Sequence, residues 1–297
     1  MNIAVTGASG SIARDLIPFL KHLGHTVIRI STSIPNNGDC DYSYDDLRSG
    51  SINHDIDIAF HLASFNSKLD KKNFNREIAL TSDLLNALQS IQCKKLIFFS
   101  TCKIYGSPGL TKKNFSEGSS LNPQCEYSKA KLQCEDFIKT KSDFLDVDSI
   151  ILRLPPILNT SKASYIGKLL ALSKTKIPFF SFVEGETNKR SFISLNNLQL
   201  VVSQILANPD VIRGSKIYNL ADKNHISLNN LLRAHSSKRI FLFPGYMSKI
   251  FQLSSLTNQL FLRIFGNFEI NSSAIENDLG LKLETTYNSL PLMNQKG

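Results

Sequence analysis

The sequence has few cysteines, and their spacing excludes the common metal sites and disulfide frameworks. No CxxC pair occurs, and no cysteine stands at a metal-like spacing from a histidine. We therefore predict no metal site. The odd number of cysteines, in a chain without a recognisable secretion signal, favours free thiols in a reducing compartment, so we expect a cytoplasmic protein. The five cysteines among the 297 residues are Cys40, Cys93, Cys102, Cys125 and Cys134.

Long apolar runs and clustered basic residues are also missing. No apolar run approaches the roughly 18 residues of a membrane-spanning helix, and Asn2–Thr6 already has the pattern of a strand. We therefore expect neither membrane insertion nor a signal peptide. The net charge of +9 is dispersed over isolated pairs such as Lys71-Lys72 and Lys238-Arg239. Nucleic-acid binding needs a clustered patch or a known module, so we expect none; the dispersed charge is either a solvated surface or an attraction for anionic nucleotides.

The first half of the sequence alternates apolar strands with segments of helical periodicity. Such β-α-β repetition predicts a parallel sheet covered by helices on both faces. We therefore expect an α/β fold, a Rossmann-type doubly wound parallel sheet, over residues 1–155. The expected strands are 3–5, 27–30, 56–61, 95–100 and 148–153, and the expected helices are about 12–23, 74–91 and 126–138.

The second half is less regular. It predicts a smaller C-terminal α/β substrate lobe over residues 156–297, with segments near 190–220 that return to the first domain. The helix expected at 247–265 lacks a basic face, so it should pack in the lobe or against a second copy, as in a homodimer, rather than lie on a membrane. Further helices are expected at 165–173 and 195–207, and strands at 216–219 and 239–243.

A glycine-containing turn lies between the first strand and the first helix. It does not fit GxGxxG but does fit GxxGxxA, from Gly7 to Ala13. Gly7 permits a tight turn, Gly10 lets the backbone approach a pyrophosphate, and small Ala13 lets the helix pack on the sheet. Free N–H groups at the helix start then meet the anion, so we favour a dinucleotide site over a plain strand-to-helix turn. The predicted contacts are Gly7, Ser9, Gly10, Ser11 and Ile12.

No acidic residue stands at the end of the second strand, where an Asp or Glu would bind the ribose 2′-OH of NAD. The segment Ile30–Ser33 carries hydroxyl groups instead, with Arg14 and Arg29 nearby. Hydroxyls and a cation suit a 2′-phosphate, so we predict NAD(P) with a slight preference for NADP, and a contact from Ser31. Arg29 can equally be a surface residue.

Tyr127 and Lys131 stand four residues apart in an expected helix, which puts both side chains on one face. A free tyrosine loses its phenolic proton near pH ~10. A nearby ammonium group, and a positively charged nicotinamide where one is bound, lower that pKa, so the phenol can exchange a proton with a sugar or alcohol hydroxyl. A packed tyrosine beside a solvated lysine is the alternative interpretation, since the spacing also arises by chance.

Five segments, taken in order along the chain, resemble the extended short-chain dehydrogenase/reductase family. This NAD(P)-dependent family includes the nucleotide-sugar epimerases and dehydratases, and the similarity covers nearly the whole length. The segments are Gly7-x-x-Gly10-x-x-Ala13, Asp57–Ala63, Phe99–Gly106, Pro123-x-x-x-Tyr127-x-x-x-Lys131-x-x-x-Glu135 and Arg190–Leu198.

The resemblance implies a catalytic set of Thr101, Tyr127 and Lys131. Tyr127 is expected to be the acid/base. Lys131 is expected to lower its pKa and to hold the nicotinamide ribose, so both residues also contact the cofactor. Thr101 is expected to hydrogen-bond the reacting oxygen of the substrate, and Arg190 to meet the substrate pyrophosphate.

The segment Asp57–Ala63 resembles the family strand that ends in His-Leu-Ala. The resemblance implies that the backbone of Leu62 and Ala63 lines the cofactor. His61 itself is interpreted as a packed, hydrogen-bonded histidine rather than as a catalyst.

Several positions depart from the family pattern. Dehydratases carry an Asp-Glu pair directly after the catalytic threonine, whereas this chain has Cys102 and Lys103. Dehydration is therefore disfavoured, because no carboxylate is there to take the C5 proton. Pro155–Leu158 replaces a segment that usually contains Asn, Tyr and Gly, Glu77 stands where the family usually has Asn, and Asn196 stands where it usually has Asp.

These features predict an NAD(P)-dependent oxidoreductase acting at C4 of a nucleotide sugar, with a UDP-linked substrate. We favour a 4-keto-sugar reductase of surface-polysaccharide biosynthesis, because Ile240–Pro244 and Leu279-Gly280 resemble the small enzymes of those pathways and the missing strand-two acid suits exchangeable NADPH. A UDP-hexose 4-epimerase with tightly bound NAD is the alternative. A non-enzymatic NAD(P)-sensing or scaffold protein is the third hypothesis, and the complete Thr-Tyr-Lys set argues against it.

Overall fold

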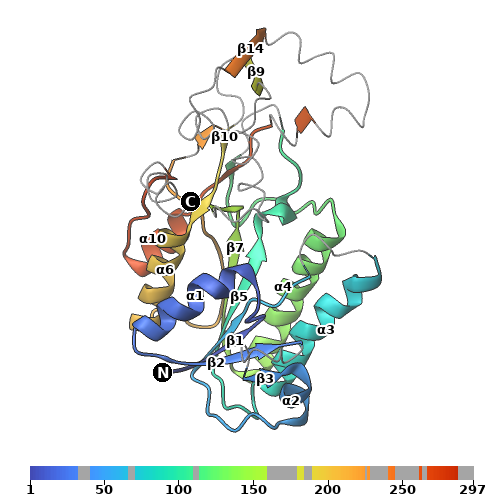
Figure 1. Ribbon diagram of the computed structural model, residues 1–297, viewed down its shortest axis with the longest axis vertical. Coiled ribbons are helices and arrows are strands. Elements are labelled where there is room, and N and C mark those ends of the chain that lie inside the picture. Colours follow the sequence, from blue (N-terminus) through green and yellow to red (C-terminus); the bar gives the residue numbers. More distant parts are fainter. Residues whose placement is uncertain are drawn as a thin grey trace. The chain divides into compact units, whose positions relative to one another are not determined.

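The computed structural model describes residues 1–32, 41–65, 71–109, 114–158, 179–183, 189–224, 226–227, 240–244, 261–262 and 266–286. The chain divides into two compact units (Figure 1). The first comprises residues 1–104, 122–153 and 202–218, and the second comprises residues 105–121, 154–201 and 219–297.

The first unit is built on seven strands: β1 (Asn2–Thr6), β2 (Thr26–Ser31), β3 (Tyr42–Ser43), β4 (Ile58–His61), β5 (Lys95–Thr101), β7 (Asp148–Leu154) and β12 (Ser215–Asn219). They form one sheet in the order β12-β7-β5-β4-β1-β2-β3. β1 pairs in parallel with β2 and β4, β2 with β3, and β4 with β5. Every residue of β4 and β5 is buried, which is the pattern of a parallel sheet covered on both faces.

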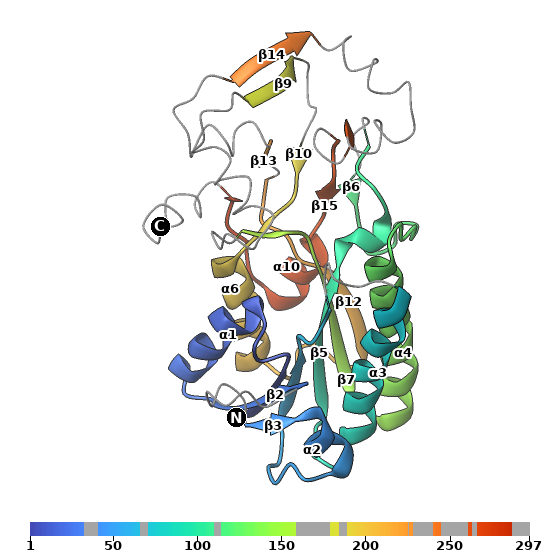
Figure 2. The same ribbon diagram turned by 45° about the vertical axis from the view of Figure 1, so that its right-hand side comes forward.

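Four helices of the first unit are α1 (Ser11–His22), α2 (Tyr44–Ser49), α3 (Lys71–Ala87) and α4 (Glu126–Leu145). α1 lies on one face of the sheet, and α3 and α4 lie side by side on the other (Figures 1 and 2). α1 buries one apolar stripe, made of Ala13, Leu16, Ile17 and Leu20. This arrangement confirms the doubly wound α/β sheet that the sequence predicts.

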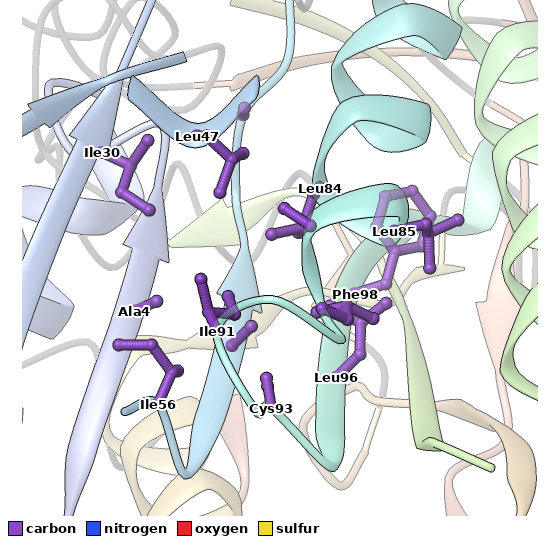
Figure 3. Packing of buried hydrophobic residues seen from close by; sticks show 14 of the residues in the cluster. Ala4, Ile30, Leu47, Ile56, Leu84, Leu85, Ile91, Cys93, Leu96 and Phe98 are labelled. Carbon is purple, nitrogen blue, oxygen red and sulfur yellow. The ribbon is translucent and has the colours of Figure 1, made fainter. Parts of the chain in front are cut away.

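An apolar cluster fixes α3 on the sheet (Figure 3). Leu84 and Leu85 of α3 lie beside Leu96 and Phe98 of β5, and all four side chains are fully buried. Burying a side chain of this size stabilises the fold by about 1.5–3 kcal/mol. This packing fixes the register of α3 against β5. It therefore also fixes the position of Glu77, which lies two helical turns before Leu84.

Some elements differ from the sequence prediction. α4 continues to Leu145, beyond the predicted end at residue 138. α2 was not predicted, because six residues are too short for a periodic signal; a capping box between Ser43 and Asp46 starts it. The helix predicted at 165–173 and nearly all of that at 247–265 lie outside the described residues. In the described part of the chain, no helix is both long and apolar enough to cross a membrane.

The second unit contains short paired strands in its described part. They are β6 (Asn114–Phe115) with β15 (Glu269–Ile270), β8 (Ile157–Leu158) with β11 (Ile193–Ser194), β9 (Phe179–Val183) with β14 (Ile240–Pro244), and β10 (Lys189–Arg190) with β13 (Ile226–Ser227). Helix α6 (Leu195–Ala207) starts in this unit, and α10 (Ser273–Leu279) lies within it. Buried Asp222 accepts hydrogen bonds from Ser194 N at 2.8 Å and Asn197 Nδ2 at 2.7 Å, which anchors the start of α6.

Candidate active site

The turn after β1 is built around Gly7, whose φ of 70° lies in the left-handed region. A Cβ atom there would lie 2.6 Å from the backbone N and Cα of Ala63, so no other residue fits. A hydrogen bond of 2.8 Å from Gly10 N to Gly7 O closes the turn. The structure thus brings Gly7, Gly10 and Ala63 together at the carboxyl ends of β1 and β4, the edge at which doubly wound sheets bind ligands.

The start of α1 presents backbone N–H groups that no side chain caps. Ser9 and Ser11 are exposed there. Ala8 N donates to Ile30 O at 3.2 Å, and the hydroxyl oxygens of Ser9 and Ser31 are 3.4 Å apart, so the turn lies against the end of β2. Uncapped amides at a helix start, beside a turn that contains two glycines, fit the pyrophosphate of a dinucleotide.

The remaining residues that we predicted near the cofactor differ in their exposure and in their partners. Ile12 and Leu62 are half-buried, and Leu62 N donates to Thr6 O at 3.2 Å. Arg29 pairs with Asp41, with 2.7 Å between Nη2 and Oδ1, so a carboxylate matches its charge. Arg14 is exposed on α1. Of the two cations behind the NADP preference, Arg29 is therefore engaged in an ion pair.

Helix α4 places Tyr127 and Lys131 one turn apart, as predicted. Lys131 is only 2% exposed, so it is not a solvated surface lysine. Its Nζ lies 4.5 Å from the centre of the Phe98 ring of β5 and 3.2 Å from Glu77 Oε1 of α3. Glu77 Oε2 also accepts a hydrogen bond of 2.9 Å from Phe65 N. The lysine is thus buried where α3, α4 and β5 meet.

The pKa of the Tyr127 phenol is raised above its usual value, chiefly because burial disfavours the phenolate. The Lys131 ammonium acts in the opposite direction, as does a hydrogen bond with the Ser64 side chain, whereas the Glu77 carboxylate opposes ionisation. We expected the lysine to dominate. Burial is the largest influence on the pKa of Lys131 and lowers it, but the charge of Glu77, the hydrogen bond to it, and smaller contributions from Tyr127 and Cys134 together make the net direction upward. The positive charge of Lys131 is therefore balanced by Glu77, and less of it is left to stabilise the phenolate of Tyr127.

Thr101 ends β5 and is buried. Its Oγ1 accepts a hydrogen bond of 3.3 Å from Lys103 N, at the start of the 3-10 helix η2 (Cys102–Tyr105). Lys103 Nζ in turn lies 5.6 Å from the centre of the Tyr127 ring. The end of β5 therefore meets the start of α4, and the three residues of the predicted catalytic set lie in one part of the first unit.

His61 is the centre of a buried hydrogen-bonded chain. Its Nδ1 lies 2.7 Å from Thr6 Oγ1, and its Nε2 lies 2.9 Å from Thr81 Oγ1. Burial, with a smaller contribution from the Lys131 charge, lowers its pKa to about 3. A histidine that is neutral at physiological pH and bonded at both nitrogens holds β1, β4 and α3 together, in agreement with a packing role.

Arg190 belongs to the second unit and is half-buried. Its Nε donates to Gly266 O at 3.2 Å, and its Nη2 donates to Leu262 O at 3.0 Å. The guanidinium group thus fastens neighbouring backbone of its own unit. Its contact with a substrate pyrophosphate stays a prediction.

Three residues near Tyr127 were not among the predicted site residues. Glu77 and Lys103 gave a signal in the sequence, since each replaces a residue type that the family pattern leads us to expect. Ser64 gave none, because a serine after a strand is common. Its place beside Tyr127 depends on the path of the chain after β4.

The sequence of residues 3–221 matches the NAD-dependent epimerase/dehydratase family. That span is well over half of the chain. The comparison with curated proteins finds no match.

Solved structures share the fold along the whole chain. The UDP-N-acetylglucosamine 4-epimerase from Bacillus cereus is 18% identical, with a TM-score of 0.76, over 100% of this chain and 99% of that one. The UDP-glucose 4-epimerase from Thermotoga maritima, solved with UDP-glucose, is 16% identical with a TM-score of 0.76 over 100% and 99%. The dTDP-glucose 4,6-dehydratase from Bacillus anthracis, in complex with NAD, is 17% identical with a TM-score of 0.72 over 99% and 96%. At these identities the likeness establishes the architecture.

Proposed function

Because the chain belongs to the NAD-dependent epimerase/dehydratase family, we propose that it acts at C4 of a UDP-linked nucleotide sugar, as an NAD(P)-dependent 4-keto-sugar reductase. The observation that carries the proposal is the placement of Tyr127 and buried Lys131 on α4, beside the end of β5. Dehydration is disfavoured, because Cys102 and Lys103 follow Thr101 and neither supplies a carboxylate for the C5 proton.

The glycine turn fits a nicotinamide dinucleotide. Gly7 lets the turn lie closely against the backbone of Ala63, Gly10 carries no side chain to hinder a pyrophosphate, and the amides at the start of α1 would bind it. Ser31 and Lys131 would hold the two riboses. When bound, the cofactor supplies the hydride. The hydroxyl groups at the end of β2 and the exposed Arg14 support NADP rather than NAD. Arg29 gives this preference less support, because it is paired with Asp41.

The surroundings of Tyr127 favour its protonated form, which is the form that a reduction needs. A phenol with a raised pKa stays protonated at neutral pH and can donate its proton to a carbonyl oxygen. The Thr101 hydroxyl would hold the same oxygen. An enzyme that begins by oxidising a sugar hydroxyl needs Tyr127 as a base instead, and burial and Glu77 both oppose that form.

A UDP-hexose 4-epimerase is the second candidate. Solved structures of this architecture include 4-epimerases, and one of these was solved with UDP-glucose. An epimerase of this kind would keep NAD bound through the cycle and would use Tyr127 in both directions. The two candidates therefore differ in whether cofactor leaves between turnovers.

Three further statements are part of the proposal. Arg190 binds the substrate pyrophosphate, the product enters surface-polysaccharide biosynthesis, and the protein forms a homodimer. The first rests on the resemblance of Arg190–Leu198 to the family segment. The second rests on the C-terminal sequence pattern, and the third on the helical spacing of apolar residues between 247 and 265, which suits packing in the lobe or against a second copy.

The test is an assay of the purified protein with a UDP-4-keto-6-deoxy sugar and NADPH, followed by the loss of NADPH absorbance. We expect turnover with the wild type, and turnover lower by roughly 10²–10⁴-fold with Tyr127→Phe. Mass spectrometry of the nucleotides released on denaturation should find little bound cofactor. Tightly held NAD, together with interconversion of UDP-hexoses without added cofactor, would replace the reductase with the epimerase. Inactivity in both assays would contradict both.

A further inference from the structure

Glu77 is a buried carboxylate to which the proposed chemistry gives no role. Its side chain is 1% exposed, and α3 is fixed beneath it by buried Leu84 and Leu85. Both oxygens are engaged: Oε1 lies 3.2 Å from Lys131 Nζ, and Oε2 accepts a hydrogen bond of 2.9 Å from Phe65 N. At this depth the two partners replace the water that a carboxylate would otherwise bind.

Glu77 also changes the charge of the site. The family resemblance leads us to expect a neutral asparagine here, so Glu77 adds one negative charge next to Lys131. An unpaired buried ammonium would favour the phenolate of Tyr127, one helical turn away. With Glu77 in contact, Lys131 and Glu77 together carry no net charge, and much of that stabilisation of the phenolate is lost.

Among the titratable side chains that face the Lys131–Glu77 pair in the described structure, no other ionised group stabilises the phenolate in place of Lys131. His61 of β4 is neutral, and burial raises the pKa of Tyr44 on α2 and of Cys134 on α4, so both stay neutral as well. Lys103 of η2 lies 5.6 Å from the Tyr127 ring but is exposed, so water screens its charge. Cys125, just before α4, is exposed and opposes the phenolate.

From this geometry we infer that Glu77 is a positioning residue which, through its ion pair with Lys131, makes Tyr127 a proton donor rather than a proton acceptor. This rests on the proposed function. In ketone reduction, the nicotinamide cofactor would supply a hydride to the carbonyl carbon, the O–H bond of Tyr127 breaks, its proton forms the new hydroxyl on the carbonyl oxygen, and the phenolate regains a proton from solvent. The exchange of the expected asparagine for Glu77 therefore adapts the site to reduction.

The first experiment is the pH profile of kcat/KM for reduction in the wild type, Glu77→Gln and Glu77→Asp. Reduction requires protonated Tyr127, so activity falls above the pKa of that residue. Without the carboxylate the phenolate is easier to form, and the alkaline limb should move down by about one pH unit in Glu77→Gln. Glu77→Asp keeps the charge and should restore the wild-type limb.

The matched control is Glu126→Gln. Glu126 lies in the first turn of α4, next to Tyr127, but it is solvated and paired with Lys129 at the surface. Its removal deletes the same charge and should leave the limb in place. A purely structural role for Glu77 would lower activity equally at all pH values, and an unmoved limb in Glu77→Gln would overturn the inference.

A second experiment needs no substrate, so it separates failure of this inference from failure of the proposed function. The ultraviolet absorbance of tyrosinate is titrated in each protein and in its Tyr127→Phe counterpart, and the difference gives the ionisation of Tyr127 alone. It should occur about one pH unit lower in Glu77→Gln than in the wild type. Equal values would overturn the inference even in an active enzyme.

Glu77→Gln leaves a buried ammonium without its partner, so a variant that avoids this is also needed. Glu77→Gln combined with Lys131→Gln removes both charges and leaves a neutral site. We expect Tyr127 to ionise within about half a pH unit of the wild type, because the two deleted charges cancel. Ionisation shifted well above the wild-type value would mean that Lys131 acts unopposed by Glu77, and would contradict the inference.

Discussion

Helix α4 carries two buried ion pairs one turn apart, and they differ in how completely their charges are satisfied. Glu135 receives Arg153 through two nitrogens, with Nη2 at 2.7 Å and Nε at 3.1 Å from Oε2, and Ser100 Oγ donates to its other oxygen. Lys131 meets Glu77 through one contact of 3.2 Å. In both pairs each side chain is 3% exposed or less.

The difference shows how one helix serves structure and chemistry at once. Arg153 cannot lose its proton, so its pair with Glu135 is a fixed, saturated link between α4 and β7. Lys131 can lose its proton when buried, and its single contact leaves it sensitive to its neighbours. The Lys131 pair is also the one beside Tyr127. We therefore assign the Glu135 pair to stability and the Glu77 pair to the ionisation of the active site.

The largest expected effect is on catalysis beside the Lys131 pair. Tyr127→Phe removes the transferable proton but keeps the ring, so turnover should fall roughly 10²–10⁴-fold. Dinucleotide binding and the free energy of unfolding should stay close to wild type, and both can be measured by cofactor titration and urea unfolding. Retained turnover would show that another group moves the proton.

The next largest effect is the stability lost when the saturated pair is broken. Glu135→Gln leaves the permanent charge of Arg153 buried and unmatched, so the free energy of unfolding should drop by about 3–5 kcal/mol. Urea unfolding at neutral pH measures this. The folded fraction should still lose activity at the same alkaline pH as the wild type. A shift of this alkaline limb would contradict the assignment of the Glu135 pair to stability alone.

Breaking the other pair should cost less, and the cost should depend on pH. In Glu77→Gln the Lys131 ammonium loses its ion pair but keeps its contact with the Phe98 ring, so we expect a loss of about 1–3 kcal/mol at neutral pH. Without Glu77, burial holds the pKa of Lys131 below its unfolded value, so the unfolded chain binds more protons and the variant gains stability as pH rises. Unfolding measured at several pH values checks this, and a loss as large and as constant as that of Glu135→Gln would contradict it.

The last effect is absent at neutral pH and concerns His61, which bonds to the same helix that carries Glu77. Its pKa falls from 6.5 in the unfolded chain to about 3 in the fold. The stability that this provides is complete above pH 6.5 and is lost as pH falls toward 3, by about 1.4 kcal/mol for each pH unit. Unfolding at pH values between these limits should show this slope, and His61→Gln should flatten it.

The sequence predicts the parts of this comparison that depend on local spacing. The alternation of apolar strands and helical periods predicts β5 and α4, and the four-residue spacing places Tyr127 and Lys131 on one face. The short helix α2 cannot be predicted from periodicity, because it is stabilised by a capping box.

The pairing of charges across the fold could not be predicted in the same way. Glu77 and Lys131 lie on different helices, and only the packing of α3 beside α4 brings them to 3.2 Å. Arg29 was expected near the cofactor because of its place in β2, but Asp41 binds it. Spacing identifies which residues share a face, whereas the partner of a charge depends on tertiary contacts.

The most direct test of the two roles is the pH profile of kcat/KM for reduction in three proteins: the wild type, Glu77→Gln and Glu135→Gln. We predict that the alkaline limb moves down by about one pH unit in Glu77→Gln and stays in place in Glu135→Gln. A limb that moves equally in both variants, or only in Glu135→Gln, would contradict the assignment of Glu77 to the active site.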